Sequence, residues 1–107
     1  MNGVPELLIL RLLRNREMYG YEIVQAIRAE TDDVVTLAEG VVYPLLHALE
    51  REGALTSRRA LINGRSRIYY AISPKGASRL ADLTGLWSRI TQALQHVLRG
   101  DDYAKGI

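Results

Sequence analysis

The spacing of apolar residues predicts three helices in the first half of the chain. Residues 4–15 are apolar too densely and for too long to form a typical strand, so we expect a helix buried on more than one side. Residues 21–30 follow a break at Gly20 and carry an apolar stripe at helical spacing. A third helix is predicted at residues 40–52, where Gly53 stands in the position of a C-terminal cap.

A hairpin is predicted after the third helix. Asn63 and Gly64 are a strong signal for a two-residue turn because both positions need a positive φ angle. The flanking segments are residues 54–62 and 65–73, and the second alternates between apolar and polar positions as a half-buried strand does. Residues 34–37 are β-like in composition, and we expect a further short strand there.

The last third of the chain predicts one long helix. Ser73 is suited to the N-cap and Pro74 to the first helical position. We expect the helix to run to about Arg99 and to stop at Gly100, which leaves residues 101–107 as a flexible tail.

This order of elements is that of a winged helix-turn-helix fold, mainly α with a small β-hairpin wing. We expect residues 1–73 to form the winged helix-turn-helix domain and residues 74–100 a C-terminal dimerisation helix. The 107 residues suffice for one ordinary domain, so any ligand must bind within it or between subunits. Cysteine is absent, which excludes disulfides, thiolate metal sites and cysteine nucleophiles; we expect neither a metal nor a cofactor.

Charge alone does not identify a partner, because the formal net charge is only +2. Of the 14 cationic residues 12 are arginine, whose planar fork suits phosphates and guanine edges. The codons of a GC-rich genome would explain the same excess, so the positions of the arginines must decide. No apolar stretch is long enough to span a membrane, and the start lacks the basic segment of a secretory signal; we expect a cytoplasmic protein.

The outward face of the third predicted helix carries groups that can contact DNA. Gly40 allows a close backbone approach, and Tyr43 can bond a phosphate or stack on a sugar. Pro44 falls near the first turn, where a missing N–H costs least. His47 and Arg51 offer donors to base edges or to the backbone. A solvated helix face is the alternative, and the hairpin argues against it.

The predicted hairpin is basic throughout, with no acidic residue at positions 54–73. Its arginines repel one another and add nothing to a core, whereas a wing lying over phosphates or in the minor groove explains them. A hairpin that was merely soluble would mix charges of both signs, although Arg67 has Glu50 or Glu52 as a candidate ion-pair partner. The DNA-binding residues expected in this wing are Arg58, Arg59, Asn63, Gly64, Arg65 and Arg67.

The long helix carries an apolar seam at heptad-like steps of three and four. At 1.5 Å per residue its length would be about 38 Å, more than so small a body can cover, so the seam needs a partner. A second copy would supply one with two-fold symmetry, and the first helix could pack against the partner's long helix. The alternative is a long helix folded entirely onto the first helix of its own chain. The expected interface residues are Leu80, Leu83, Trp87, Ile90, Leu94 and Val97.

Three segments of the chain resemble the PadR-like family of transcriptional regulators. They are residues 19–23 (YGYEI), 40–53 (GVVYPLLHALEREG) and 64–76 (GRSRIYYAISPKG). The resemblance covers almost the whole chain and implies a homodimer on a near-palindromic operator in double-stranded DNA, with the third helix in the major groove and the wing on the backbone. It also implies repression, for instance of an adjacent gene, that an effector relieves. It places Tyr19 among the DNA-binding residues.

Residues 87–89 (WSR) are similar to those of compact, multidrug-binding members of this family with a single C-terminal helix. In those members paired tryptophans sandwich flat aromatic drugs, so the resemblance implies a planar aromatic effector at Trp87; ordinary interface core is the alternative. Two features depart from the family: Val42 stands where many members have a phosphate-binding threonine, and few residues precede the first helix. The expected ligand-binding residues are Trp87, Leu8, Leu12, Leu83 and Ile90.

Two other functions compete with a DNA-binding regulator. A winged helix that only binds proteins is one, and the wing arginines argue against it. An enzyme is the other, and its case is poor: His47 and His96 lie on different predicted elements, without paired carboxylates, a phosphate loop or metal-ligand spacing.

Overall fold

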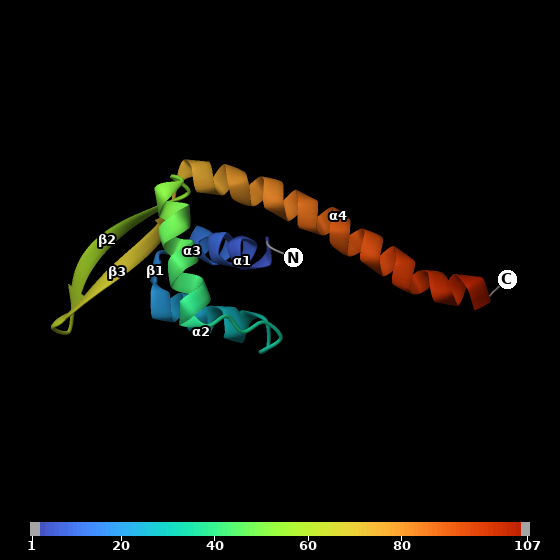
Figure 1. The fold of residues 1–107 in the computed structure, drawn as a ribbon, viewed down its shortest axis with the longest axis horizontal. Helices are drawn as coiled ribbons and strands as arrows, with labels where there is room; N and C mark the ends of the chain where they lie inside the picture. Colours follow the sequence, from blue (N-terminus) through green and yellow to red (C-terminus); the bar gives the residue numbers. More distant parts are fainter. Residues whose placement is uncertain (1–2, 106–107) are drawn as a thin grey trace.

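The computed structural model describes residues 3–105 and has the predicted winged helix-turn-helix architecture (Figure 1). Three short helices and a small sheet form the body, and the last helix runs away from it, which makes the molecule 67 Å long and 27 Å by 22 Å across. The elements are α1 (Val4–Asn15), β1 (Met18–Tyr19), α2 (Gly20–Glu30), α3 (Glu39–Arg51), β2 (Leu55–Ile62), β3 (Arg65–Ile72) and α4 (Pro74–Lys105).

The core lies between α1 and the elements that surround it: α2, α3, the sheet and the start of α4. The dense apolar sequence of α1 predicted burial on more than one side, and the helix does bury side chains on several sides. The apolar stripes predicted for the second and third helices also point inward. The largest fully buried side chains are Ile9, Leu10, Ile23, Ile27, Val42, Leu46, Leu49 and Leu55.

The strand predicted at residues 34–37 is wrong, because this segment is the loop that joins α2 to α3. The Thr31 hydroxyl accepts a hydrogen bond from the Val35 N–H at 3.1 Å. This N–H therefore bonds to the residue that follows α2 and not to a neighbouring strand. Asp32 and Asp33 adopt positive φ angles of 49° and 63°, which turn the chain sharply. Val34 is 84% exposed and therefore has no apolar surface to pack against.

The sheet has a third strand that the sequence did not predict, and its order is β1-β3-β2. In β1, Met18 pairs with Tyr70 and Tyr19 pairs with Tyr69, both antiparallel. The predicted turn is confirmed: Asn63 and Gly64 have φ angles of 52° and 78°. β1 therefore fastens the connection between α1 and α2 to the middle of the wing.

The long helix begins as predicted but continues past its predicted end. The Ser73 hydroxyl accepts a hydrogen bond from the Gly76 N–H at 3.0 Å, which is the expected N-cap. The stop at Gly100 is wrong, since α4 continues to Lys105; one glycine costs a helix only about 1 kcal/mol relative to alanine and does not end it. Residues 106–107 of the predicted tail lie outside the described residues. None of the helices in the described part of the chain combines the length and apolarity that a membrane crossing needs.

Four residues form a joint at which α3, the hairpin and α4 meet. Gly53 ends α3 with a φ angle of 82°, as its capping position predicted. The Ser73 hydroxyl donates to the Gly53 carbonyl oxygen at 2.6 Å, and the Ser73 N–H donates to the Ala54 carbonyl oxygen at 3.0 Å. The backbone of Gly76 passes so close that a Cβ atom there would lie 2.1 Å from the Ala54 oxygen. Only glycine fits at this position without a backbone shift.

We expect Gly76→Ala to lower the free energy of unfolding by about 2 kcal/mol, because the methyl group must displace backbone at the joint. Gly85→Ala is the matched control in the same helix, since its Cβ would meet only the end of the Arg89 side chain, at 3.8 Å. The control should gain up to about 1 kcal/mol from helix propensity. Urea titration at a fixed protein concentration measures both, and equal stability of the two variants would contradict the tight joint.

Candidate nucleic-acid interface

Four exposed residues of α3, called the reading face below, are Gly40, Pro44, His47 and Arg51. These side chains share one side of the helix because they follow one another at intervals of three and four residues. Pro44, predicted near the first turn, lies inside α3, which begins one residue earlier than predicted, at Glu39. The Gly40 carbonyl therefore lacks the N–H donor that residue 44 would normally supply, and a hydrogen-bond acceptor is left on the reading face.

Tyr43 lies beside the reading face but is half-buried. Its ring packs on the backbone of Gly20, where a Cβ atom would fall 2.4 Å from the ring. Burial, with smaller contributions from Glu39 and Tyr19, raises the pKa of the Tyr43 hydroxyl. The phenol therefore keeps its proton at neutral pH and can donate a hydrogen bond to a phosphate.

A cleft of about 230 Å³ separates the reading face from the wing. Tyr43 and His47 line it from α3, while Ser66, Ile68 and Tyr70 line it from β3. The second strand of the hairpin thus lies directly beside the reading face. The structure brings the two predicted DNA-binding regions together on one side of the body.

The arginines of the wing divide between the two faces of the hairpin. In the strand register Arg58 lies opposite Tyr69, and Arg59 lies opposite Ile68. Because side chains alternate along a strand, Arg59 shares the inner face with Ile68 and the buried Tyr70. The outer face holds Arg58, Arg65 and Arg67.

Aromatic rings hold two of the outer arginines. The Arg67 guanidinium lies 4.4 Å from the centre of the Tyr19 ring, and the Arg58 guanidinium lies 5.1 Å from that of Tyr69. The two rings meet edge to face, with centroids 5.6 Å apart. Tyr19, which the family resemblance placed at the DNA, therefore supports a wing arginine from outside the hairpin.

The ion pairs of this region differ from those considered on sequence. Arg67 pairs with neither of the two glutamates proposed for it: Glu50 accepts a hydrogen bond from the Ser57 hydroxyl, and Glu52 forms an ion pair with Arg79. The wing is nevertheless not free of acidic partners. Glu17, which precedes β1, forms an ion pair with Arg58. No sequence pattern indicates this pairing, because the two residues are far apart along the chain.

The predicted dimer seam on α4 is partly buried in its own chain. Leu80 is only 3% exposed and belongs to the core, so its assignment to an interface is wrong; the first turns of α4 cover α1 and β3. Leu83 also packs against this core. Further along, Leu94 and Val97 are 57% and 69% exposed. The outer half of α4 therefore presents apolar side chains that its own body leaves uncovered.

An open groove of about 540 Å³ runs between α1 and α4. Trp87 lines it from α4, and Leu7 and Leu8 line it from α1. Of the predicted ligand-binding residues, Trp87 and Leu8 are thus brought together, whereas Leu83 and Ile90 are not among the residues that line this groove.

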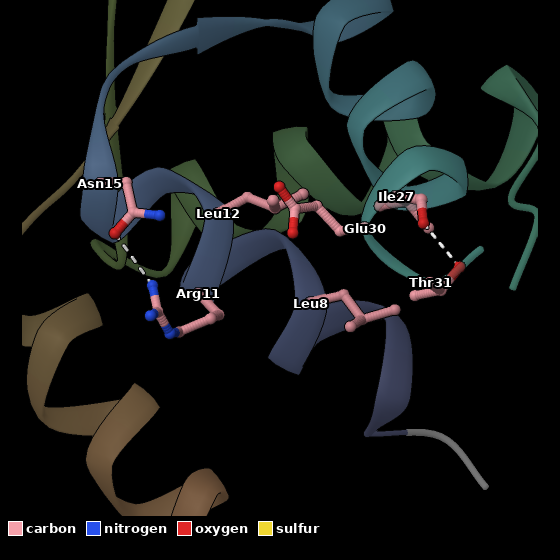
Figure 2. A pocket seen from close by; sticks show the side chains of 7 residues that line it. All are labelled: Leu8, Arg11, Leu12, Asn15, Ile27, Glu30 and Thr31. Carbon is pink, nitrogen blue, oxygen red and sulfur yellow. Dashed lines mark hydrogen bonds between the residues drawn. The ribbon is translucent and has the colours of Figure 1, made fainter. Parts of the chain in front are cut away.

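Leu12, the remaining predicted ligand-binding residue, lies in a neighbouring pocket between α1 and α2. This pocket measures about 240 Å³, and Leu8, Leu12 and Ile27 contribute apolar side chains to its lining (Figure 2). Arg11 and Glu30 are among its polar lining residues. Among the described side chains, no group of three histidines, aspartates or glutamates could hold a metal ion.

Comparison with known proteins links this geometry to transcriptional regulators. The model of the "Transcriptional regulator PadR-like family" matches residues 9–82. A transcriptional regulator from Clostridium thermocellum is 29% identical, with a TM-score of 0.79 over 88% of this chain and 91% of that one. A transcriptional regulator from Mycobacterium tuberculosis is 33% identical over 70 residues, which are 65% of this chain and 63% of that protein.

One similar structure contains DNA. Bacillus subtilis PadR in complex with operator DNA is 28% identical, with a TM-score of 0.71 over 77% of this chain. This chain spans 46% of that protein, so the similarity concerns less than half of it.

Proposed function

The chain belongs to the PadR-like family of transcriptional regulators, and on this premise we propose that it is a homodimeric repressor which binds a near-palindromic operator and is released by a planar aromatic effector. Its family places it among DNA-binding regulators and not among enzymes, as the sequence predicted. Dimerisation, repression and the effector are the parts that we add.

The placement of the reading face beside the wing carries the proposal for operator binding. His47 and Arg51 are exposed on a helix that a major groove can accommodate, and the tip of the hairpin at Asn63 and Gly64 projects away from the body. Tyr43 supplies a protonated phenol at the cleft between the two. Base contacts from α3 and phosphate contacts from the wing would then occur together, which is the division of labour that specific DNA binding needs.

We expect Arg65→Ala combined with Arg67→Ala to weaken binding to every duplex and to lower the slope of log affinity against log salt by about 0.9 for each phosphate that is no longer neutralised. Arg89→Ala with Arg99→Ala is the matched control, because it removes the same charge from α4. Fluorescence anisotropy with DNA from upstream of its own gene, at several salt concentrations, measures the slope. If both pairs of substitutions changed it equally, the wing would have no special role.

The exposed outer half of α4 supports the proposed homodimer. Leu94, Val97 and Leu98 are 57%, 69% and 72% exposed, a dense apolar surface for a helix that runs beyond its own body. A second copy related by a two-fold axis would cover it and would place two α3 helices on two half-sites. A near-palindromic operator follows from that symmetry.

We expect Leu94→Asp combined with Val97→Asp to give folded monomers, because both side chains are exposed in the single chain and neither belongs to its core. Gln92→Asp with Gln95→Asp adds the same charge to the same stretch of helix and should leave the dimer intact. Analytical ultracentrifugation separates the two outcomes. A stable dimer of the Leu94 and Val97 variant would mean that subunits meet elsewhere.

The groove between α1 and α4 supports the proposed effector. Its volume of about 540 Å³ lies within the range of small-molecule sites, and Trp87 lines it together with the apolar Leu7 and Leu8. The groove lies on α4 at the level of the proposed dimer seam, so a ligand there would bear directly on the spacing of the two subunits.

We expect planar aromatic dyes to quench the fluorescence of Trp87, which is the only tryptophan of the chain. Thr91→Arg, which places a long charged side chain in the groove, should abolish the quenching. Thr36→Arg is the control, because Thr36 lies in the exposed loop between α2 and α3. A diverse panel of dyes without any quenching would leave Trp87 as plain interface core.

A further inference from the structure

An ion pair joins the middle of the wing to the segment between α1 and β1. Arg58 of β2 donates two hydrogen bonds to the carboxylate of Glu17, from Nε to Oε2 at 2.9 Å and from the terminal Nη2 to Oε1. Two parallel bonds between a guanidinium and a carboxylate fix both the position and the orientation of the arginine. Arg58 therefore has a defined partner on the protein.

The aromatic contacts extend this ion pair into a cluster on the outer face of the sheet. Arg58 lies over the ring of Tyr69, Tyr69 meets Tyr19 edge to face, and Arg67 lies over Tyr19. We call Glu17, Tyr19, Arg58, Arg67 and Tyr69 the Glu17 cluster. It contains two arginines, but only Arg58 meets a carboxylate, while Arg67 rests on a neutral ring.

The electrostatic states of the pair follow from this geometry. The hydrogen bond from Arg58 lowers the pKa of Glu17, so this carboxylate is charged at neutral pH and the pair is neutral as a whole. The side chains of Glu17 and Arg58 are 37% and 56% exposed. The pair is thus open to solvent, and its arginine stands on the same face as Arg65 and Arg67.

We propose that Glu17 withholds Arg58 from DNA phosphates and so lowers the affinity of the wing for DNA of any sequence. This inference rests on the proposed contact between the wing and the DNA backbone. Binding to non-specific DNA comes almost entirely from charge, whereas binding to an operator adds base contacts from α3. A cation that is held on the protein therefore lowers the affinity for both kinds of DNA by the same factor, which is a larger fraction of the binding free energy for non-specific DNA. The phosphates are left to Arg59, Arg65 and Arg67.

Glu17→Gln tests this role, because it removes the charge of the carboxylate and keeps the shape of the side chain. With an unrelated duplex, the freed Arg58 should neutralise one more phosphate. For each protomer this should steepen the slope of log affinity against log salt by about 0.9 and tighten binding about eightfold at 0.1 M salt. Arg58→Ala alone should leave the slope unchanged. The double variant, Glu17→Gln with Arg58→Ala, should return to the wild-type slope.

Glu30→Gln is the matched control, since it removes one exposed carboxylate from α2, away from the wing. The proposal is overturned if Glu17→Gln and Glu30→Gln give the same slope, or if Arg58→Ala alone makes the slope shallower by about 0.9, which would place Arg58 on a phosphate already. A wild-type chain whose binding to DNA does not depend on salt would instead overturn the proposed wing contacts, and the role of Glu17 with them.

Discussion

The close passage of the Gly76 backbone past the Ala54 carbonyl oxygen fixes the three elements on which function depends. It sets where α4 starts relative to the end of α3, and the hairpin leaves from the same point and returns to it. The Ser73 hydroxyl strengthens this joint from both sides, because it donates to the carbonyl that ends α3 and accepts the N–H that begins α4. None of the three elements can change direction without the other two.

One turn further along α4, Arg79 makes a second clamp. It donates to Glu52 at the end of α3 and to Glu6 in the first turn of α1, each at 2.8 Å. Glu6 is the residue before Leu7, which lines the groove between α1 and α4. The same contacts at the ends of α1, α3 and α4 therefore position the groove, the reading face and the wing relative to one another. A molecule that wedged α1 and α4 apart would act on the same side chain that holds the end of α3.

The parts of the fold that the sequence predicted are those specified by local patterns. Helical periodicity predicted α1, α2 and α3 to within a residue or two, and the φ preferences of Asn63 and Gly64 predicted the turn of the hairpin. The sequence did not predict β1, because two residues are too few to show alternation. Its pairing partners also lie some fifty positions away along the chain. The prediction that α4 ends at Gly100 was wrong because it relied on a local preference alone. That preference, of about 1 kcal/mol, is too weak to end a helix.

For the candidate site, periodicity identified the reading face but could not describe the environment of each side chain. Arg58 was grouped with the other wing arginines because the hairpin contains no acidic residue, yet its partner Glu17 arrives from another element. The seam of α4 was continuous in sequence, but the body covers Leu80 and leaves Leu94 exposed. Both differences arise from tertiary contacts, which one-dimensional spacing does not encode.

The modest net charge of +2 gives these placements their importance. A strongly basic domain binds any DNA, and its base contacts must then compete with its own non-specific affinity. Here carboxylates border the interface: Glu39 opens α3 and Glu50 lies on its exposed side, while Glu17 stands beside the wing. Their repulsion of phosphates falls on every duplex alike, but only an operator offers base contacts in return. Acidic residues at the edge of a basic surface thus lower the affinity for every duplex, and the base contacts of α3 then supply a larger fraction of the binding free energy.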